Sequence, residues 1–444
     1  MSARPVIILG AGLAGLSAAY HLESGYEIYE QESRPGGLCR SMTLDGFTFD
    51  SAVHVLYSRD GYAAPLIKHL LGDNLLTIDR SSWVFSHGVY TPYPFQASTY
   101  GLPAQVRAEC LLGLFEAKQR ESAHSGRPTS FGDWIMRTFG AGIAKHFMIP
   151  FNRKLWGVDP DDMGWEWVVD RIPVPRLEDV VLGALEDQSA RLGPNAVFWY
   201  PAEGGMESLA RAFLPHVQGL RPDAQVVRIM ARDHRVVLAD DRETSYDRLI
   251  SSAPLPRLVE MIDDVPEKVR TTASSLRCNR VLAVHLGIDR ASISDKHWVY
   301  YPEPQFAIQR TSFPSNFASG LAPKGTSSIT AEITAADGWS RDAVVERVLS
   351  DLRLAGVLTP RDQVLVAHVQ EIHPAYVIYQ HNHREQVKAL TDFLEPNGIF
   401  PCGRFGDWEY LNMDHAILSG KRAAERAVGR SLTGRHARGD NRES

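Results

Sequence analysis

The residues with the clearest chemical meaning are three glycines near the N-terminus. Gly10, Gly12 and Gly15 have the GxGxxG spacing, after an apolar run at residues 6–9 and before a segment of helical periodicity. Such glycines let the backbone approach a pyrophosphate, and the helix N-terminus offers unpaired N–H groups to that anion. Glu30 ends a second strand-like run, where a carboxylate can accept hydrogen bonds from ribose hydroxyls. The pattern predicts a dinucleotide-binding βαβ unit.

A second glycine pair narrows the choice of cofactor. Gly36 and Gly37 follow Glu30 closely, and an Asp-Gly-Phe-Thr-Phe-Asp segment comes next, at residues 45–50. This arrangement resembles the second glycine-rich segment of flavoproteins of the glutathione-reductase-like class, which runs along the FAD. We therefore expect FAD rather than NAD as the bound cofactor.

Composition excludes several classes of protein. The chain has 444 residues, of which 44% are hydrophobic and 23% charged, and its formal net charge is −6. These values are ordinary for a globular enzyme and offer no basic field for nucleic acid or an anionic membrane. The four cysteines are far apart, with no CxxC, which predicts reduced thiols in a cytoplasmic protein and no metal site. The sequence leaves a homo-oligomer open.

Periodicity predicts the elements that position these residues. The fold class is α/β, with a Rossmann-like FAD-binding domain of the glutathione-reductase class, an inserted helical domain and an antiparallel sheet domain. The FAD-binding domain is discontinuous, because strand and helix patterns return to it late in the chain. The expected parts are an FAD-binding domain (1–58, 196–256 and 396–428), a helical domain (60–78 and 98–170), a sheet domain for substrate (79–97, 171–195 and 257–395) and a flexible tail (429–444).

Two further segments carry residue types suited to a nucleotide ligand. Tyr93, Phe95 and Gln96 place two aromatic rings and an amide beside prolines, and could stack and pair with a base. Taken alone, this segment is more commonly an aromatic core turn. Arg171 precedes a Pro-Val-Pro-Arg run, and a loop of this kind can fold over a diphosphate with planar, bidentate donors. The alternative for Arg171 is a solvated surface charge.

Several segments in order resemble the UDP-galactopyranose mutase family, more the eukaryotic-type than the shorter bacterial enzymes. The resemblance covers roughly residues 4–428. Beyond the motifs above, it rests on the segments at 131–135, 152–156, 193–196, 298–303 and 403–414, together with Arg310.

The resemblance implies a role for each matching position. Tyr93, Phe95 and Gln96 would hold the base, and Asn152 and Trp156 would line the uridine and sugar side. Arg171 and Arg310 would clamp the diphosphate, with hydroxyl donors on three tyrosines; Asn195 would contact the nucleotide-sugar. The tyrosines are Tyr300, Tyr376 and Tyr410, the FAD would be held by Arg404 and Asp414, and His54 would lie beside the flavin ring.

The implied activity is a redox-neutral interconversion of the pyranose and furanose forms of a nucleotide-diphospho-sugar. In that family, N5 of the reduced flavin attacks the anomeric carbon and the nucleoside diphosphate leaves. NADPH or NADH is the expected reductant. Two other interpretations stay open: an FAD-dependent oxidoreductase of the amine-oxidase or protoporphyrinogen-oxidase type, and a flavin-binding protein without catalysis.

The sequence departs from the family pattern in three places. Ala52 and Val53 stand where the family usually has Gly-Gly before the histidine, and Tyr376 lacks the expected following proline. The segment at 410–414 is closer to the bacterial pattern. These changes leave the sugar open, and also whether the nucleotide is UDP or GDP.

Overall fold

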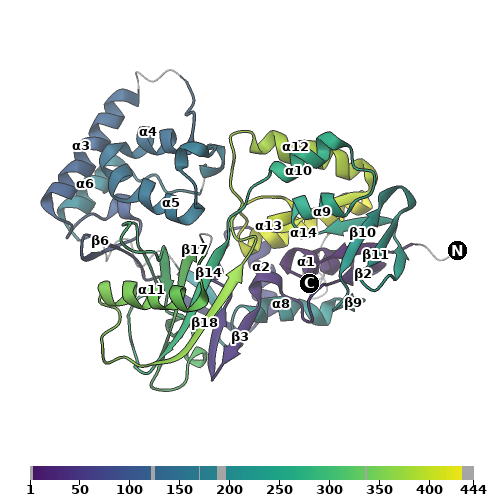
Figure 1. Cartoon of the computed structure of the whole chain (residues 1–444), viewed down its shortest axis with the longest axis horizontal. Coiled ribbons are helices and arrows are strands. Elements are labelled where there is room, and N and C mark those ends of the chain that lie inside the picture. The colour runs from purple at the N-terminus through teal and green to yellow at the C-terminus, as the bar shows by residue number, and fades with distance from the viewer. Residues whose placement is uncertain (1–3, 122–125, 170, 188–196, 336–337, 433–444) are drawn as a thin grey trace, which may run out of the picture.

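The computed structural model describes residues 4–121, 126–169, 171–187, 197–335 and 338–432. Two large sheets organise the chain, with a helical part beside one of them (Figure 1). The predicted α/β class with a Rossmann-like core and an added sheet domain is confirmed.

A five-stranded parallel sheet forms the nucleotide-binding half. Its strands are short apolar runs buried on both sides, which is what a parallel sheet covered by helices requires. The order is β19 (Ile399–Pro401), β13 (Arg248–Ser251), β1 (Val6–Leu9), β2 (Tyr26–Tyr29), β9 (Leu220–Arg221). Three helices pack together on one face, namely α1 (Leu13–Leu22), α8 (Glu207–Phe213) and α14 (Met413–Val428).

The turn from β1 into α1 depends on glycine. Gly10 has φ +91°, and a Cβ on Gly15 would lie 1.9 Å from the carbonyl oxygen of Gly10. A side chain at Gly15 would therefore push the helix off the strand. The fingerprint spacing thus sets the close packing of α1 on the sheet.

A seven-stranded sheet forms the other half. Most neighbouring strands are antiparallel, as predicted, but β15 pairs with β6 in parallel, so the sheet is mixed. The order is β18 (Val364–Ile372), β14 (Val281–Ile288), β17 (Ser327–Thr334), β16 (Arg310–Ser312), β15 (Trp298–Tyr300), β6 (Ser82–Ser86), β7 (Val89–Pro92).

The two faces of this sheet differ in chemistry. On β17, Ile329, Ala331 and Ile333 pack in one apolar cluster with α11 (Arg341–Leu354), which covers that face (Figure 1). The alternating residues Thr330 and Glu332 are polar and buried on the opposite face. Because side chains alternate along a strand, the sheet presents polar groups to the rest of the molecule.

The helical part consists of four helices that pack on one another. A Cβ on Gly142 would lie 2.0 Å from the carbonyl oxygen of Glu109, so two of the helices cross at backbone contact. Ser130 caps the second helix by accepting from N of Asp133 at 2.9 Å, as predicted. The helices are α3 (Ala104–Glu121), α4 (Phe131–Ile143), α5 (Ile149–Trp156) and α6 (Leu177–Leu185).

Three segments pack elsewhere than predicted. Helix α2 (Ala63–Leu71), expected in the helical domain, buries Leu66 and Ile67 in the core around α1. Residues 75–78, expected to continue that helix, belong to β5 (Leu75–Asp79), which pairs with β8 (Val197–Pro201). Helix α6, expected in the sheet domain, packs on α3 (Figure 1). Local periodicity identifies a helix or strand but does not say which core it joins.

A further group of helices also leaves the predicted sheet domain. Their apolar residues share a cluster with Leu9 and Leu249 of the parallel sheet. These helices are α9 (Leu255–Met261), α10 (Glu267–Ser275) and α12 (His383–Leu394). The same cluster contains the meander β10 (Val226–Met230), β11 (Arg235–Leu238), β12 (Glu243–Ser245). The nucleotide-binding half is therefore larger than expected.

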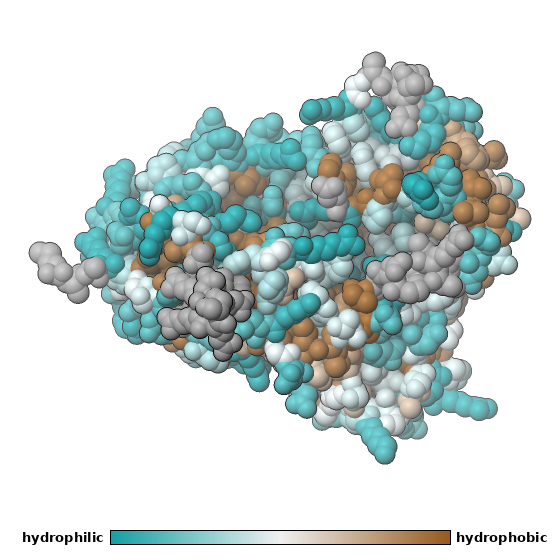
Figure 2. Space-filling model, turned by 180° about the vertical axis from the view of Figure 1, so that it is seen from behind, coloured by the Kyte–Doolittle hydropathy of each residue, from teal (hydrophilic) through white to brown (hydrophobic). Residues whose placement is uncertain are grey.

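Two short elements complete the fold, the hairpin β3 (Ser41–Leu44) with β4 (Phe47–Asp50) and the helix α13 (Gly403–Gly406). The surface seen in Figure 2 is largely hydrophilic, with apolar side chains gathered at its right-hand edge. Among the described residues, no helix combines the length and apolar character needed to span a membrane.

Candidate functional site

A cavity of about 180 Å³ opens between the helical part and the polar side of the seven-stranded sheet. Aromatic rings, amides, two arginines and the apolar Met148, Leu155 and Ile172 line it, and none of the described residues among its lining is acidic. From the predicted site it contains Tyr93, Gln96, Asn152, Trp156, Arg171, Tyr300, Arg310, Tyr376 and Tyr410. The structure thus brings together nine predicted residues from segments more than 300 positions apart.

Arg310 is held in the cavity wall by a carboxylate on the neighbouring strand. Arg310 and Glu332 are register partners on β16 and β17, so their side chains share a face. The guanidinium donates from Nη2 to Oε2 of Glu332 at 2.7 Å and from Nε to Oε1 at 3.2 Å. The Glu332 side chain is only 1% exposed and that of Arg310 17%. Arg310 therefore enters the cavity with a fixed orientation.

Glu332 also reaches the segment that carries His54. Its Oε1 accepts from the backbone N–H of Val53 at 3.1 Å. Burial, reinforced by the charges of Arg404 and Arg310, lowers the pKa of His54 to about 3. Its Nδ1 is buried and has no partner among the described residues. His54 is therefore a neutral imidazole with a polar atom left for a ligand or cofactor.

Arg171 closes one side of the cavity. Its Nη1 donates to the carbonyl oxygen of Tyr410, and its guanidinium lies 5.7 Å from the centre of that ring. The loop after the helical part thereby touches a segment of the nucleotide-binding half. Within the described ranges, neither Arg171 nor Arg404 forms an ion pair with a carboxylate. Both guanidiniums can therefore accept an anionic partner.

Four tyrosines supply hydroxyl groups around these arginines. Tyr376 and Tyr410 stack with centroids 5.6 Å apart, and Arg404 lies 4.8 Å from the Tyr410 ring. Nη2 of Arg310 lies 3.4 Å from the Tyr376 hydroxyl. Burial is the largest cause that raises the pKa values of Tyr93, Tyr300 and Tyr376 above the ordinary value. These hydroxyls therefore stay protonated and can donate to an anion.

The amides at the other end are only partly satisfied. Gln96 donates from Nε2 to the carbonyl oxygen of Pro173 at 2.8 Å, while its buried Oε1 lacks a partner in the described part of the chain. Asn152 donates to Met148 O at 2.7 Å and accepts from Trp156 Nε1 at 3.0 Å, both contacts of helix α5. Gln96 is free to accept from a ligand, whereas Asn152 mainly orients Trp156.

Phe95 corrects one prediction. The structure does not bring it to the cavity: its side chain is fully buried and stacks on Phe147 with centroids 5.0 Å apart. Strand-like alternation ends at this point and a short turn begins, so Phe95 and its neighbours do not share one face. The alternative to a base-binding role, an aromatic turn in the core, therefore holds for Phe95 but not for Tyr93 or Gln96.

The glycine segments form a backbone cradle next to α1. Gly12 and Gly36 form a parallel bridge, and a Cβ on Gly37 would lie 3.2 Å from Cα of Gly12. Glu30 is buried and accepts from N of Ala11 at 2.6 Å, so its carboxylate also orders this turn. A side-chain-free surface at a helix N-terminus fits the pyrophosphate of a dinucleotide. The residues present fit FAD.

Two predicted cofactor contacts lie at the other end of the chain. Arg404 donates from Nη2 to Leu411 O at 2.7 Å, which turns its guanidinium toward the tyrosines of the cavity. Asp414 is buried in the first turn of α14 and accepts from N of His415 at 2.8 Å. Their contacts with FAD stay predictions, and Asn195 lies outside the described residues.

Sequence reasoning missed several residues of the site. Gln309 lines the cavity directly before Arg310, and Phe151 and Trp167 add aromatic walls. Glu332 was missed because β17 alternates apolar and polar residues, and a carboxylate on the polar face of such a strand is ordinary. Gln309 left no sequence signal, since a glutamine before an arginine is commonplace.

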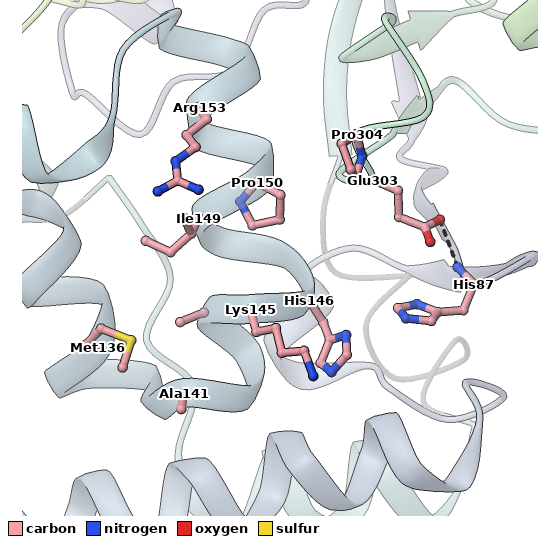
Figure 3. A pocket seen from close by; sticks show the side chains of 11 residues that line it. His87, Met136, Ala141, Lys145, His146, Ile149, Pro150, Arg153, Glu303 and Pro304 are labelled. Carbon is pink, nitrogen blue, oxygen red and sulfur yellow. Dashed lines mark hydrogen bonds between the residues drawn. The ribbon is translucent and has the colours of Figure 1, made fainter.

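A second, more open cavity of about 570 Å³ lies between the helical part and the segments that carry His87, Glu303 and Pro304 (Figure 3). Its cations already have partners. Lys145 Nζ and His146 Nε2 each lie 2.8 Å from Oε2 of Glu109, and Arg153 pairs with Asp159. This cavity therefore lacks the unpaired charge of the first one. The described residues also contain no group of three or more His, Cys, Asp or Glu side chains that could hold a metal ion.

Comparison with solved structures finds the same architecture in flavoenzymes. A reduced UDP-galactopyranose mutase superposes with a TM-score of 0.89, at 27% identity over 96% of both chains. Wild-type putrescine oxidase bound to putrescine matches with a TM-score of 0.66, at 18% identity over 96% of this chain and 99% of that one.

Comparison with curated proteins points to oxidases. Coproporphyrinogen III oxidase of Bacillus subtilis (strain 168) is 20% identical over 471 aligned positions, covering 95% of this chain and 97% of the oxidase. The family model of the flavin containing amine oxidoreductases matches residues 13–428. The chain therefore belongs to the flavin containing amine oxidoreductase family, with FAD as the cofactor that the family indicates.

Proposed function

We propose that this flavoenzyme interconverts the pyranose and furanose forms of a sugar linked to a nucleoside diphosphate. The observation that carries the proposal is the convergence of Arg171 and Arg310 with four tyrosine hydroxyls on one cavity. A diphosphate that leaves and returns needs charge-assisted donors on several sides. An aliphatic amine would instead need an acidic partner, and none of the described residues that line the cavity is acidic.

The charge of the cavity suits a diphosphate. Arg310 is balanced by Glu332, whereas Arg171 and the nearby Arg404 have no carboxylate partner in the described ranges. The site is therefore net positive before a ligand binds. The Arg310 guanidinium is largely shielded from water, so it attracts an anion more strongly than it would in bulk water.

The amide end of the cavity suits the base. Tyr93 and Phe151 offer ring faces, and Oε1 of Gln96 is a buried acceptor without a partner in the described residues. The N–H on the edge of uracil would satisfy this acceptor. We favour a UDP-linked substrate, a UDP-galactose-like sugar, because of the family resemblance at Tyr93 and Gln96.

Glycines 10, 12, 15, 36 and 37 and Glu30 would hold the FAD, with Arg404 and Asp414 beside it. When bound and reduced, FAD supplies the nucleophile for the anomeric carbon. The chain's own residues hold the leaving diphosphate on Arg171 and Arg310. Arg171 is exposed at the edge of the cavity, where its contact with the carbonyl oxygen of Tyr410 holds it beside the ligand site. The solved mutase supports the proposal through its 27% identity over 96% of both chains.

The proposed reaction requires a reduced flavin but consumes no electrons, so the proposal is tested by measuring whether activity needs a reductant and whether the reductant is used up. The purified holoenzyme would be incubated with UDP-galactose and UDP-galactofuranose, with and without dithionite, and the products separated by chromatography. Interconversion only after reduction, with no net use of electrons, is the expected result. Absence of furanose and pyranose interconversion with both UDP-linked and GDP-linked sugars would refute it.

An oxidoreductase is the second candidate, favoured by the full-length match to coproporphyrinogen III oxidase. Its substrate carries carboxylates, which Arg171 and Arg310 could also bind. The same holoenzyme would be mixed with coproporphyrinogen III in air. Stoichiometric oxygen uptake and formation of the oxidised tetrapyrrole would support the oxidase and count against the mutase.

A further inference from the structure

Gln309 occupies a fixed position in the wall of the cavity. It directly precedes β16, and its backbone is held on both sides: N donates to Glu332 O at 2.9 Å and O accepts from Tyr301 N at 3.0 Å. The residue is only 1% exposed. Its side chain lines the cavity together with Trp156 and Arg310. Gln309 is therefore a rigid, buried part of the ligand site.

The amide of Gln309 is left half satisfied. Oγ1 of Thr334 lies 2.8 Å from Oε1 of Gln309 and 3.1 Å from the carbonyl oxygen of Leu155. Nε2 of Gln309 is buried and has no partner among the described residues. A buried amide donor without a partner is unfavourable, so such groups usually have a partner in the working state of a protein.

The arrangement at Thr334 favours a hydroxyl group as the missing partner. The threonine hydroxyl has one proton and two acceptors within reach. When it donates to Leu155, the amide of Gln309 can turn over and donate to Thr334, which leaves Oε1 unpaired instead. A hydroxyl group both donates and accepts, so it pairs with Gln309 in either orientation. A phosphate oxygen accepts only and pairs with one.

We infer that Gln309 is a specificity residue that binds a hydroxyl group of the nucleotide-sugar, either on the ribose or on the transferred sugar. The inference rests on the proposed function for the identity of the ligand. Gln309 stands next to Arg310, so the hydroxyl belongs to a sugar that adjoins the diphosphate. The ribose and the transferred sugar are each bonded to one end of the diphosphate. Because either sugar can reach Gln309, the two sources need separate tests.

Binding to the oxidised holoenzyme distinguishes them. Flavin fluorescence would be titrated with UDP, UDP-galactose, 2′- and 3′-deoxy-UDP, and the monodeoxygalactose derivatives of UDP-galactose. Gln309→Met keeps the length of the side chain and removes its polar atoms. The matched control is Gln305→Met, since Gln305 is exposed on the same segment.

Loss of a hydrogen bond to a buried amide is expected to weaken binding about tenfold. If the transferred sugar is the partner, Gln309→Met weakens the binding of UDP-galactose but not the binding of UDP. One monodeoxy sugar then binds the native enzyme about tenfold more weakly and binds the variant as well as the parent ligand does. If the ribose is the partner, Gln309→Met weakens the binding of UDP too. One of the two deoxy-UDP ligands then binds the native enzyme more weakly than UDP does and binds the variant as well as UDP does.

Two results would overturn the inference. One is native affinity of Gln309→Met for both UDP and UDP-galactose. The other is weaker binding that no deoxy ligand reproduces, which would indicate a phosphate contact. The deoxy ligands test the native protein directly, so the inference stays falsifiable even if the variant does not fold. Failure of the native holoenzyme to bind UDP, UDP-galactose and the corresponding GDP-linked ligands would instead refute the proposed function.

Discussion

Glu332 and Arg310 form a buried ion pair across two neighbouring strands, and the same carboxylate accepts from the backbone N–H of Val53. One side chain thus fixes the arginine that would hold the diphosphate and the segment that leads to His54. Val53 stands where the mutase pattern has glycine, yet its N–H is what Glu332 uses. The difference from the family pattern therefore changes the side chain at position 53 but keeps the backbone hydrogen bond to Glu332.

Glu332→Gln should make the thermal stability of the protein depend more strongly on bound ligand. Removing one partner of a buried ion pair costs about 3–5 kcal/mol, because the other charge is left uncompensated. A bound diphosphate would supply the missing negative charge to Arg310. UDP should therefore raise the midpoint of thermal unfolding more in the variant than in the native protein. Equal shifts in the two proteins would mean that the ligand does not reach Arg310.

Arg171→Ala and Arg310→Ala should each lower kcat/KM roughly a hundredfold or more while the flavin spectrum stays native. Charge-assisted bonds to phosphate contribute on the order of 1.5–3 kcal/mol each, and more where water is excluded. Arg153→Ala is the matched control, because Arg153 pairs with Asp159 beside the other cavity. Steady-state kinetics with UDP-galactofuranose measure the effect. Near-native turnover of Arg310→Ala would place the diphosphate elsewhere.

Gly12→Val should release the flavin and leave the fold intact. A Cβ at Gly12 would meet only the Gly37 Cα, at 3.8 Å, so the protein itself has room for a side chain there. The same side chain would occupy the cradle expected to hold the FAD pyrophosphate. Visible absorbance and thermal unfolding of the purified variant separate the two effects. Gly61→Ala, which meets nothing within 4 Å, is the control. A fully flavinated Gly12→Val protein would contradict the prediction.

Two buried histidines should make the protein less stable in acid. Their pKa values fall from 6.5 to about 3 for His54 and about 4 for His285, in each case chiefly through burial. Below pH 6.5 the unfolded chain takes up protons that the folded chain does not, so stability present above that pH is lost as pH falls. The slope is about 1.4 kcal/mol per pH unit for each histidine.

His285→Gln should lower this slope by about 1.4 kcal/mol per pH unit, while the contribution of His383, whose pKa burial also lowers to about 4, stays in the variant. Urea unfolding of the native protein and the variant, measured at several values between pH 6.5 and about 4.5, gives the comparison. The difference between slopes decides the matter, so a general loss of stability in the variant does not obscure it. An unchanged slope would show that His285 is protonated in the folded protein.

Gln96→Ala should narrow the difference in affinity between UDP and GDP. Oε1 of Gln96 is buried without a partner in the described residues, and a site built around polar pairing rejects a mismatched base because buried groups stay unsatisfied. Fluorescence titration of the holoenzyme with both nucleotides measures the difference. If the difference stays as it is in the native enzyme, other residues discriminate between the bases.

Much of the fold follows from local patterns. The strand at residues 6–9, the glycine turn and the helix after it depend on residues that are neighbours in sequence, and so does the Ser130 cap. The closing helix α14 likewise follows from its own periodicity. The assignment of helices to domains did not follow, because an amphipathic helix such as α2 shows that it needs an apolar partner without showing which one.

The candidate site likewise has a part that the sequence predicts and a part that only the tertiary structure shows. The sequence alone determined a dinucleotide fingerprint, which depends on residue type and short spacing. Its resemblance to the mutase family implied the full set of arginines, tyrosines and amides suited to a nucleotide. Only the tertiary structure decided that Phe95 lies in the core, that Gln309 lines the cavity, and that Glu332 holds Arg310. The physical reason is register: a strand pairing between β16 and β17 places two side chains on one face, and a shift of one residue would separate them.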